Sequence, residues 1–253
     1  MQSTRRYMLN IIAIGGGDLG AGETLSLDQL IVHSTGKTQP NALFIPTASD
    51  DSLEYWDIFQ SIYKERLGCQ ADVLYLIREQ PTFEAIQNKI AWADLIYVGG
   101  GNTRTMLALW RRLGVDHLLD DAGERGTILS GLSAGANCWF KYANSDAPII
   151  EGEVGVKTVR VECLGLVDIA MCPHMKREDF RLEEFTRMMK NTPGIGIGLD
   201  DMCALQVRGQ EYKIIAAEDG MMAHKIYWEG EQFHHERIEP TQNFQPLQQL
   251  MRL

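Results

Sequence analysis

Residues 127–137 read TILSGLSAGAN, and this stretch does most to decide the fold. The apolar run 127–130 predicts a short buried strand, and residues 131–137 predict a sharp turn into a helix. Glycines stand two before and two after Ser133, which is the G-x-S-x-G pattern of a nucleophile elbow. Small residues are needed there because a larger side chain would clash where the strand reverses. Such a turn exposes the serine hydroxyl and directs the amide of Ala134 toward the group that the serine attacks. The alternative is a tight turn that merely contains a serine, which would have the same pattern.

Two alternating patterns along the chain indicate the fold class. Near-continuous apolar runs typical of buried strands lie at 9–14, 42–47, 72–76, 95–98, 127–131 and 167–171. Amphipathic stretches with helical spacing lie at 52–67, 82–92, 103–113 and 177–190. Strands of this kind separated by helices predict an α/β fold, with a mostly parallel sheet covered on both faces.

The C-terminal part of the chain changes character. Short alternating runs at 204–208, 212–217, 222–228 and 232–238 predict antiparallel hairpins at the edge of the sheet. We find no repeat, low-complexity segment or linker in the sequence. We therefore expect residues 1–253 to form a single domain.

Composition narrows the class of protein. The net charge of −10 argues against nucleic-acid and membrane partners, because either would require a basic patch. Five scattered cysteines without a Cys-x-x-Cys pair indicate reduced thiols in a cytoplasmic protein, and no zinc-type spacing is present. The apolar start runs into glycines, so it predicts a first strand and not a signal peptide. No run approaches the roughly 20 apolar residues of a membrane span.

Two glycine runs follow predicted strands. In residues 99–103 (GGGNT), the amides of Gly100 and Gly101 could complete an oxyanion hole with that of Ala134. The alternative is a loop that only needs positive φ. Residues 15–20 formally fit the dinucleotide pattern G-x-G-x-x-G, but no acidic residue ends a second strand at the required distance. An NAD-dependent enzyme is therefore a weak hypothesis.

A serine nucleophile needs a histidine base. Of the six histidines, His174 follows the apolar run 165–171, at the same predicted sheet edge as Ser133. His224, His234 and His235 fall in the hairpin region, where we expect them on a sheet surface. His174 is therefore the candidate base.

The base in turn needs an orienting carboxylate. Asp200 and Asp201 follow the short glycine-rich strand 195–199. Asp146 lies in a segment before Pro148 where turn chemistry alone could explain it. The residues by themselves do not choose between these positions.

Taken together, these segments resemble the serine peptidases of the peptidase E (α-aspartyl dipeptidase) and cyanophycinase family. The resemblance spans nearly the whole chain, through 9–17, 44–49, 97–103, 131–137, 173–174 and 198–201. It implies a three-layer α/β/α sandwich related to class I glutamine amidotransferases, with serine in place of their elbow cysteine. It also implies peptide hydrolysis with no metal or organic cofactor.

The resemblance assigns roles to single residues. Ser133 matches the family's nucleophile and His174 its general base. Asp201 falls where cyanophycinase-like members carry glutamate, and Asp146 matches an aspartate sometimes assigned to the triad of peptidase E. We rank Asp201 first, because a residue after a strand end beside the histidine strand is better placed to reach His174.

The same resemblance extends to the surroundings of the serine. Gly100 and Gly101 match the family's oxyanion loop. Asn102, Arg104 and Arg177 are candidates for binding the substrate. The segment after His174 lacks the Phe-Thr-Asn of peptidase E, so specificity for an N-terminal aspartate does not carry over.

The sequence therefore predicts a cytoplasmic serine peptidase, a monomer or homodimer, that hydrolyses small peptides through an acyl-enzyme on Ser133. A non-peptidase amidase or hydrolase with the same triad is one alternative. A catalytically silent binding protein is the other.

Overall fold

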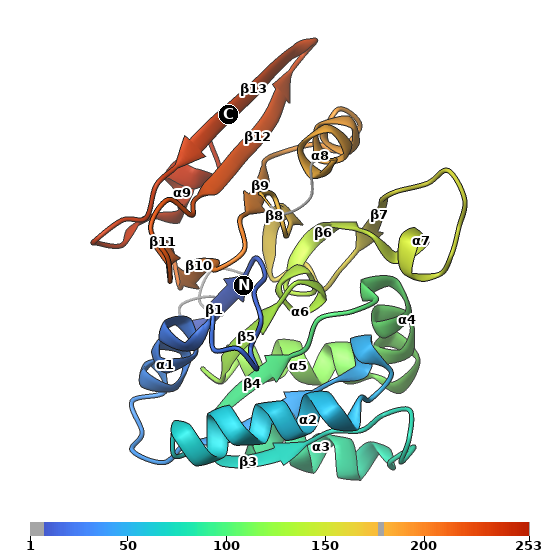
Figure 1. Cartoon of the computed structure of the whole chain (residues 1–253), viewed down its shortest axis with the longest axis vertical. Coiled ribbons are helices and arrows are strands. Elements are labelled where there is room, and N and C mark those ends of the chain that lie inside the picture. The colour runs from blue at the N-terminus through green and yellow to red at the C-terminus, as the bar shows by residue number, and fades with distance from the viewer. Residues whose placement is uncertain (1–7, 177–179, 253) are drawn as a thin grey trace.

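The computed structural model describes residues 8–176 and 180–252, and its strands form two sheets (Figure 1). The larger sheet has the order β14-β11-β10-β1-β5-β4-β2-β3. Its members are β1 (Asn10–Ile14), β2 (Asn41–Ile45), β3 (Gln70–Val73), β4 (Leu95–Val98), β5 (Ile128–Leu132), β10 (Cys203–Arg208), β11 (Glu211–Ala216) and β14 (Gln245–Pro246). Strands β1 to β5 pair in parallel, whereas β10, β11 and β14 add antiparallel pairs on the far side of β1.

Helices cover both faces of the larger sheet because its central strands are apolar on both faces. In β1, Ile11 and Ala13 belong to one buried cluster, and Ile12 and Ile14 belong to the other. The first cluster includes residues of α3 (Phe83–Trp92), α4 (Thr103–Leu113) and α5 (Val115–Glu124). The second includes residues of α1 (Leu25–Ser34), α2 (Leu53–Phe59) and the π-helical segment η3 (Gln60–Arg66). Around these strands the structure is a three-layer α/β/α sandwich.

The smaller sheet has the order β13-β12-β9-β8-β6-β7. Its members are β6 (Phe140–Ser145), β7 (Val159–Glu162), β8 (Val167–Cys172), β9 (Gly196–Leu199), β12 (Ala223–Glu229) and β13 (Gln232–Ile238). Helix α8 (Arg181–Met189) packs Phe185 and Met189 against one face of it, beside Cys172 and Ile226. Short helices η2 (Thr47–Ser49), α6 (Ala134–Asn137), α7 (Ala147–Ile150) and α9 (Leu247–Leu250) complete the described elements.

The predicted α/β class is confirmed, and the six predicted strands and the helices at 82–92 and 103–113 lie close to their expected positions. The division into two sheets was not predicted. β6 and β7 mix charged or polar residues with apolar ones, so neither has the apolar run of a central strand. The C-terminal hairpins also separate: β10 and β11 extend the larger sheet, and β12 and β13 extend the smaller one.

The chain crosses between the two sheets at two turns that matter for the site. One follows β5 and leads through α6 to β6, and the other joins β9 to β10 over residues 200–202. All five cysteine side chains are buried free thiols. Across residues 8–176 and 180–252, no helix is long and apolar enough to cross a membrane.

Candidate active site

The elbow is held by close backbone approach to the neighbouring strand. A Cβ on Gly131 would lie 2.4 Å from the carbonyl oxygen of Val98 in β4, and one on Gly135 would lie 2.0 Å from the same oxygen. Both glycines of the G-x-S-x-G pattern are therefore required by space. Ser133 between them has φ 54° and ψ −112°, a strained conformation that persists only where the surroundings enforce it.

The structure brings Ser133, His174 and Asp201 together. His174 Nε2 lies 2.9 Å from Ser133 Oγ, and His174 Nδ1 lies 2.5 Å from Asp201 Oδ1. The side chains of His174 and Asp201 are mostly buried, at 13% and 15% exposure. An ionised Asp201 places the imidazole proton on Nδ1, which leaves Nε2 free to accept a proton from the serine.

Three successive carbonyl groups at the end of β1 hold the three segments that carry these side chains. The Ile14 carbonyl accepts from the Ser133 amide, and the Gly15 carbonyl accepts from the His174 amide. The Gly16 carbonyl accepts from the amide of Met202, the residue after Asp201. The end of β1 is thus the common support of residues that lie far apart in the sequence.

The glycine run after β1 lets these segments approach the end of the strand closely. A Cβ on Gly16 would lie 2.0 Å from Asp201 Oδ1 and 2.4 Å from His174 Nδ1. A Cβ on Gly15 would lie 2.2 Å from the Asp200 carbonyl oxygen. Gly16, inside the run that formally fits a dinucleotide pattern, therefore lies directly against the histidine–aspartate pair, a role that the sequence analysis missed.

Of the proposed oxyanion residues, Ala134 follows Ser133 directly in the chain and Gly100 lies against the Ser133 side chain. The amide of Ala134, the first residue of α6, has no acceptor within its helix. Gly100 is close enough that its Cβ would lie 3.4 Å from Ser133 Cβ, and its amide donates to the Tyr55 hydroxyl over 3.4 Å. Gly101 packs against the Ala48 carbonyl with φ +134°, so that position also needs glycine.

Asp146, the second candidate acid, lies elsewhere. Its Oδ2 accepts a hydrogen bond from Arg181 Nη2 over 2.7 Å, and the Arg181 side chain is fully buried. The structure therefore places Asp201 next to His174 and gives Asp146 an arginine partner from α8.

The predicted substrate-binding residues that the structure describes have partners within the chain. Asn102 caps α4 by accepting from the Thr105 amide, and its side-chain amide donates to Glu151 over 2.8 Å. Arg104 forms ion pairs with Glu151 and Glu153. These contacts satisfy the Arg104 cation that we expected to bind the substrate. Arg177 lies outside the described residues.

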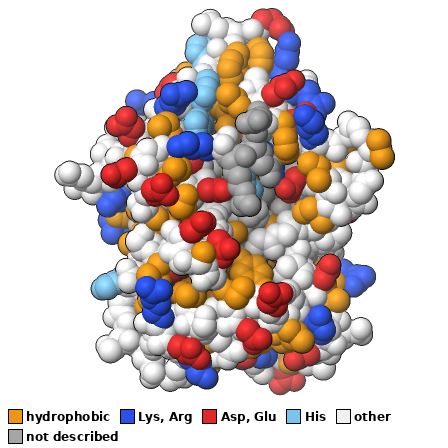
Figure 2. All heavy atoms as spheres, viewed as in Figure 1, with side chains coloured by type: hydrophobic (Ala, Val, Ile, Leu, Met, Phe, Trp, Pro, Cys, Tyr) orange, Lys and Arg blue, Asp and Glu red, His pale blue; other side chains and the backbone are white. Residues whose placement is uncertain are grey.

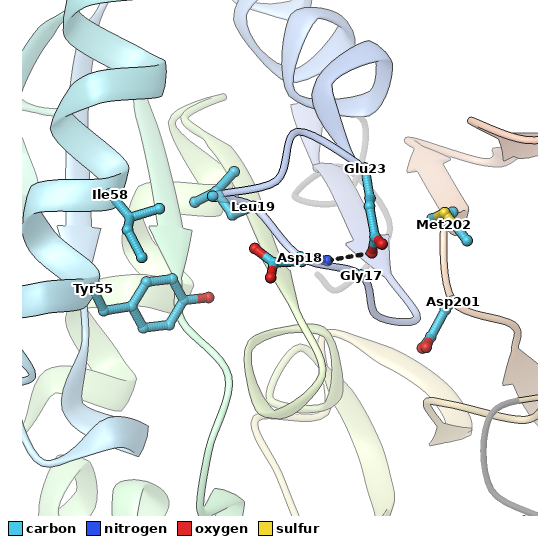
Figure 3. Close-up of a pocket in the computed structure, with 9 residues that line it drawn as sticks. Gly17, Asp18, Leu19, Glu23, Tyr55, Ile58, Asp201 and Met202 are labelled. Carbon is cyan, nitrogen blue, oxygen red and sulfur yellow. Dashed lines mark hydrogen bonds between the residues drawn. The ribbon is translucent and has the colours of Figure 1, made fainter.

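A pocket of about 640 Å³ opens beside Asp201 (Figure 3). It is lined by Gly17, Asp18, Leu19, Gly20, Glu23, Tyr55, Ile58, Asp201 and Met202. Glu23 accepts from the Asp18 amide over 2.8 Å, which holds the turn after β1 in place (Figure 3). Acidic side chains gather around this part of the surface in the space-filling view (Figure 2).

A second histidine–aspartate pair lies next to the first and was also missed. His224 Nε2 is 3.1 Å from Asp200 Oδ1, and His224 Nδ1 is 3.0 Å from His235 Nε2. His224 and His235 are thus partners in a polar network, where a plain sheet surface was expected. Among the described residues, no group of three or more His, Cys, Asp or Glu side chains is arranged to hold a metal ion.

Comparisons with known proteins identify the family of the chain. The chain is similar to the uncharacterized peptidase YgaJ of Bacillus subtilis (strain 168), with 34% identity over 222 residues that cover 87% of this chain and 92% of that protein. It is also similar to peptidase E of a Nostoc species, with 26% identity over 204 residues that cover 74% and 77% of the two chains. The crystal structure of a peptidase from an acI-B1 Actinobacterium shares the fold, with a TM-score of 0.67 over 94% of this chain and 96% of that one at 18% identity. Residues 11–215 match Peptidase family S51, and the chain therefore belongs to that family of hydrolases.

Proposed function

We propose that this chain is a serine peptidase that hydrolyses small peptides through an acyl-enzyme on Ser133. The observation that carries the proposal is the hydrogen-bond chain from Asp201 through His174 to the Ser133 hydroxyl. A hydroxyl, a base and an orienting carboxylate in this order are the parts that nucleophilic acyl transfer requires. Membership in family S51 and similarity to a protein called peptidase E support the peptide bond as the target.

In this mechanism Ser133 Oγ attacks the peptide carbonyl carbon while His174 Nε2 takes the hydroxyl proton. Asp201 stabilises the imidazolium that forms, through its bond to Nδ1. The amides of Ala134 and of Gly100 or Gly101 bind the oxyanion, where one donor is typically worth about 3 kcal/mol of transition-state stabilisation. His174 then protonates the leaving amine, and water attacks the acyl-enzyme with His174 as base to release the acid.

The nucleophile is tested with Ser133→Ala, and Ser130→Ala provides a matched control. Loss of the nucleophile should lower kcat by a factor on the order of 10⁵–10⁶ while the circular dichroism spectrum is unchanged. Ser130 lies three residues earlier, on β5, and its hydroxyl donates to the Ile96 carbonyl over 2.8 Å. Its variant should lose about 1 kcal/mol of stability and keep its activity. Unchanged hydrolysis in Ser133→Ala would refute the proposed nucleophile.

The substrate class is tested with a panel of Asp-X, neutral and β-aspartyl dipeptides, together with a fluorophosphonate probe. Turnover of any dipeptide with labelling of Ser133 supports the peptidase. Labelling without turnover of any peptide would point to an amidase or another hydrolase. A folded chain that shows neither labelling nor turnover would point to a binding protein.

A further inference from the structure

Tyr55, on the first turn of α2, lies at the glycine loop that faces the nucleophile. Its hydroxyl oxygen accepts the Gly100 amide over 3.4 Å, and Gly100 in turn lies against the Ser133 side chain. Tyr55 also lines the pocket beside Asp201, into which its hydroxyl points (Figure 3). No sequence motif pointed to this residue.

The ring of Tyr55 is held in place on several sides. It packs edge-on against Phe44 with ring centroids 5.0 Å apart, and its Cε1 would be 2.8 Å from a Cβ on Gly99. Ser52 caps the start of α2 by accepting the Tyr55 amide over 3.2 Å. The hydroxyl is therefore a preorganised group, which is what electrostatic stabilisation of a transition state requires.

The Tyr55 hydroxyl retains a proton to donate. Its oxygen is an acceptor in the bond with Gly100, and within the described residues no acceptor is assigned to its own proton. Burial, the largest influence, raises the pKa of Tyr55 to about 12, so the phenol stays protonated at any working pH. The group is thus a neutral donor beside an amide that already belongs to the proposed oxyanion site.

We propose that Tyr55 is a further catalytic residue, whose hydroxyl donates a hydrogen bond to the oxyanion beside the amides of Gly100 and Ala134. The inference rests on the proposed function, because it requires acyl transfer at Ser133. A substrate carbonyl oxygen that reaches the Gly100 amide replaces the phenol oxygen as its acceptor. The phenol proton is then directed at the same oxygen, and the bond strengthens as negative charge develops there.

The test is Tyr55→Phe, which keeps the ring packing and removes only the hydroxyl. Tyr97→Phe is the matched control, because Tyr97 lies in the same aromatic cluster and its buried hydroxyl has no partner among the described residues. We expect kcat of Tyr55→Phe to fall by about 10²–10³-fold with KM within about threefold of wild type. Binding of a small aryl boronic acid, which forms a tetrahedral anion on serine, should weaken by a similar factor. Tyr97→Phe should change neither kcat nor the affinity for the boronic acid.

Three results would overturn the assignment. These are a kcat of Tyr55→Phe within about threefold of wild type, a loss confined to KM with unchanged boronate affinity, or a fall in Tm well beyond that of Tyr97→Phe. Fluorophosphonate labelling separates this failure from failure of the proposed function. If Ser133 is labelled in both proteins and they turn over substrate equally, only the role of Tyr55 is refuted. If Ser133 is not labelled in wild type, both proposals are refuted.

Discussion

Asp200 and Asp201 are consecutive residues, and each is hydrogen-bonded to a histidine, yet the two pairs are built for different purposes. Asp201 contacts His174, whose second ring nitrogen faces the Ser133 hydroxyl. Asp200 contacts His224, whose second ring nitrogen faces another imidazole, that of His235. A histidine–aspartate pair is therefore not a catalytic device in itself. What differs is the group at the far side of the ring.

The supports of the two pairs also differ. Asp200 is buried, its second carboxylate oxygen accepts the Met222 amide over 3.0 Å, and its own amide donates to the Met222 carbonyl. These bonds fasten the β9–β10 turn to the start of β12. Asp201 instead lies over Gly16 and lines the pocket. One carboxylate anchors the turn, and the other contacts His174.

The largest expected effect separates the two aspartates directly. Asp201→Asn should lower kcat by a factor on the order of 10⁴, because an asparagine favours the wrong imidazole tautomer of His174. Asp200→Asn should change kcat by less than about tenfold and act mainly on stability. Steady-state kinetics and urea denaturation of both variants measure the contrast. Equal losses of kcat would mean that the two pairs act as one unit.

The next effect concerns Gly16, which lies against the His174–Asp201 pair. Gly16→Ala should push His174 and Asp201 apart and lower kcat by about 10²-fold, since a displacement of about 1 Å can cost that much. Gly20→Ala is the control, because the nearest atom to its new Cβ is 3.3 Å away. Activity in Gly16→Ala equal to that in Gly20→Ala would show that the support by Gly16 is unimportant.

A smaller effect is expected at Asp146, the acid that pairs with arginine. Asp146→Asn should lower the free energy of unfolding by about 2 kcal/mol, the scale of a hydrogen bond to a charged group. Its kcat should stay within about threefold of wild type. Urea denaturation and kinetics together test this, and a loss of kcat comparable with that of Asp201→Asn would restore Asp146 as the catalytic acid.

The smallest effect is a pH dependence at the second pair. Burial, and then the neighbouring His224 and Arg237, lower the pKa of His235 below its ordinary value of 6.5. The folded state therefore binds fewer protons than the unfolded state, so this contribution to stability is present above pH 6.5 and is lost as pH falls through the lowered pKa. Between about pH 8 and about pH 5.5, Tm should fall more in wild type than in His235→Gln. Parallel curves of Tm against pH for wild type and His235→Gln would contradict this prediction.

How much the sequence could predict depended on the range of the interaction. The apolar runs of β1, β2, β4 and β5 reflect burial on both faces, and the elbow glycines reflect a local turn. Both features could therefore be predicted from the sequence. These features are properties of single elements. His174, in contrast, was expected at the same sheet edge as Ser133, but β8 belongs to the smaller sheet and β5 to the larger one, so the two residues meet across the sheets.

The features that could not be predicted depend on which helices and strands come into contact in the folded chain. Glu151 pairs with Arg104 although the two are 47 residues apart in the sequence, and no pattern in either segment predicts the pair. His224 and His235 are neighbours only through the register of β12 with β13, in which His224 lies opposite Arg237 and His235 opposite Ile226. Asp146 and Asp201 each follow a plausible turn, and only the packing of α8 and of the β9–β10 turn separates them.

The three carbonyl groups at the end of β1 bear on how the chain becomes active as it folds. β1 lies near the start of the sequence and pairs with β5 near the middle and with β10 near the end. Contacts between residues so far apart are slow to form, because the chain must close long loops before they stabilise anything. Until that closure is complete, Ser133, His174 and Asp201 have no common support. A newly made or partly folded chain would therefore contain all three residues of the proposed triad and still lack the arrangement that the proposed peptidase requires.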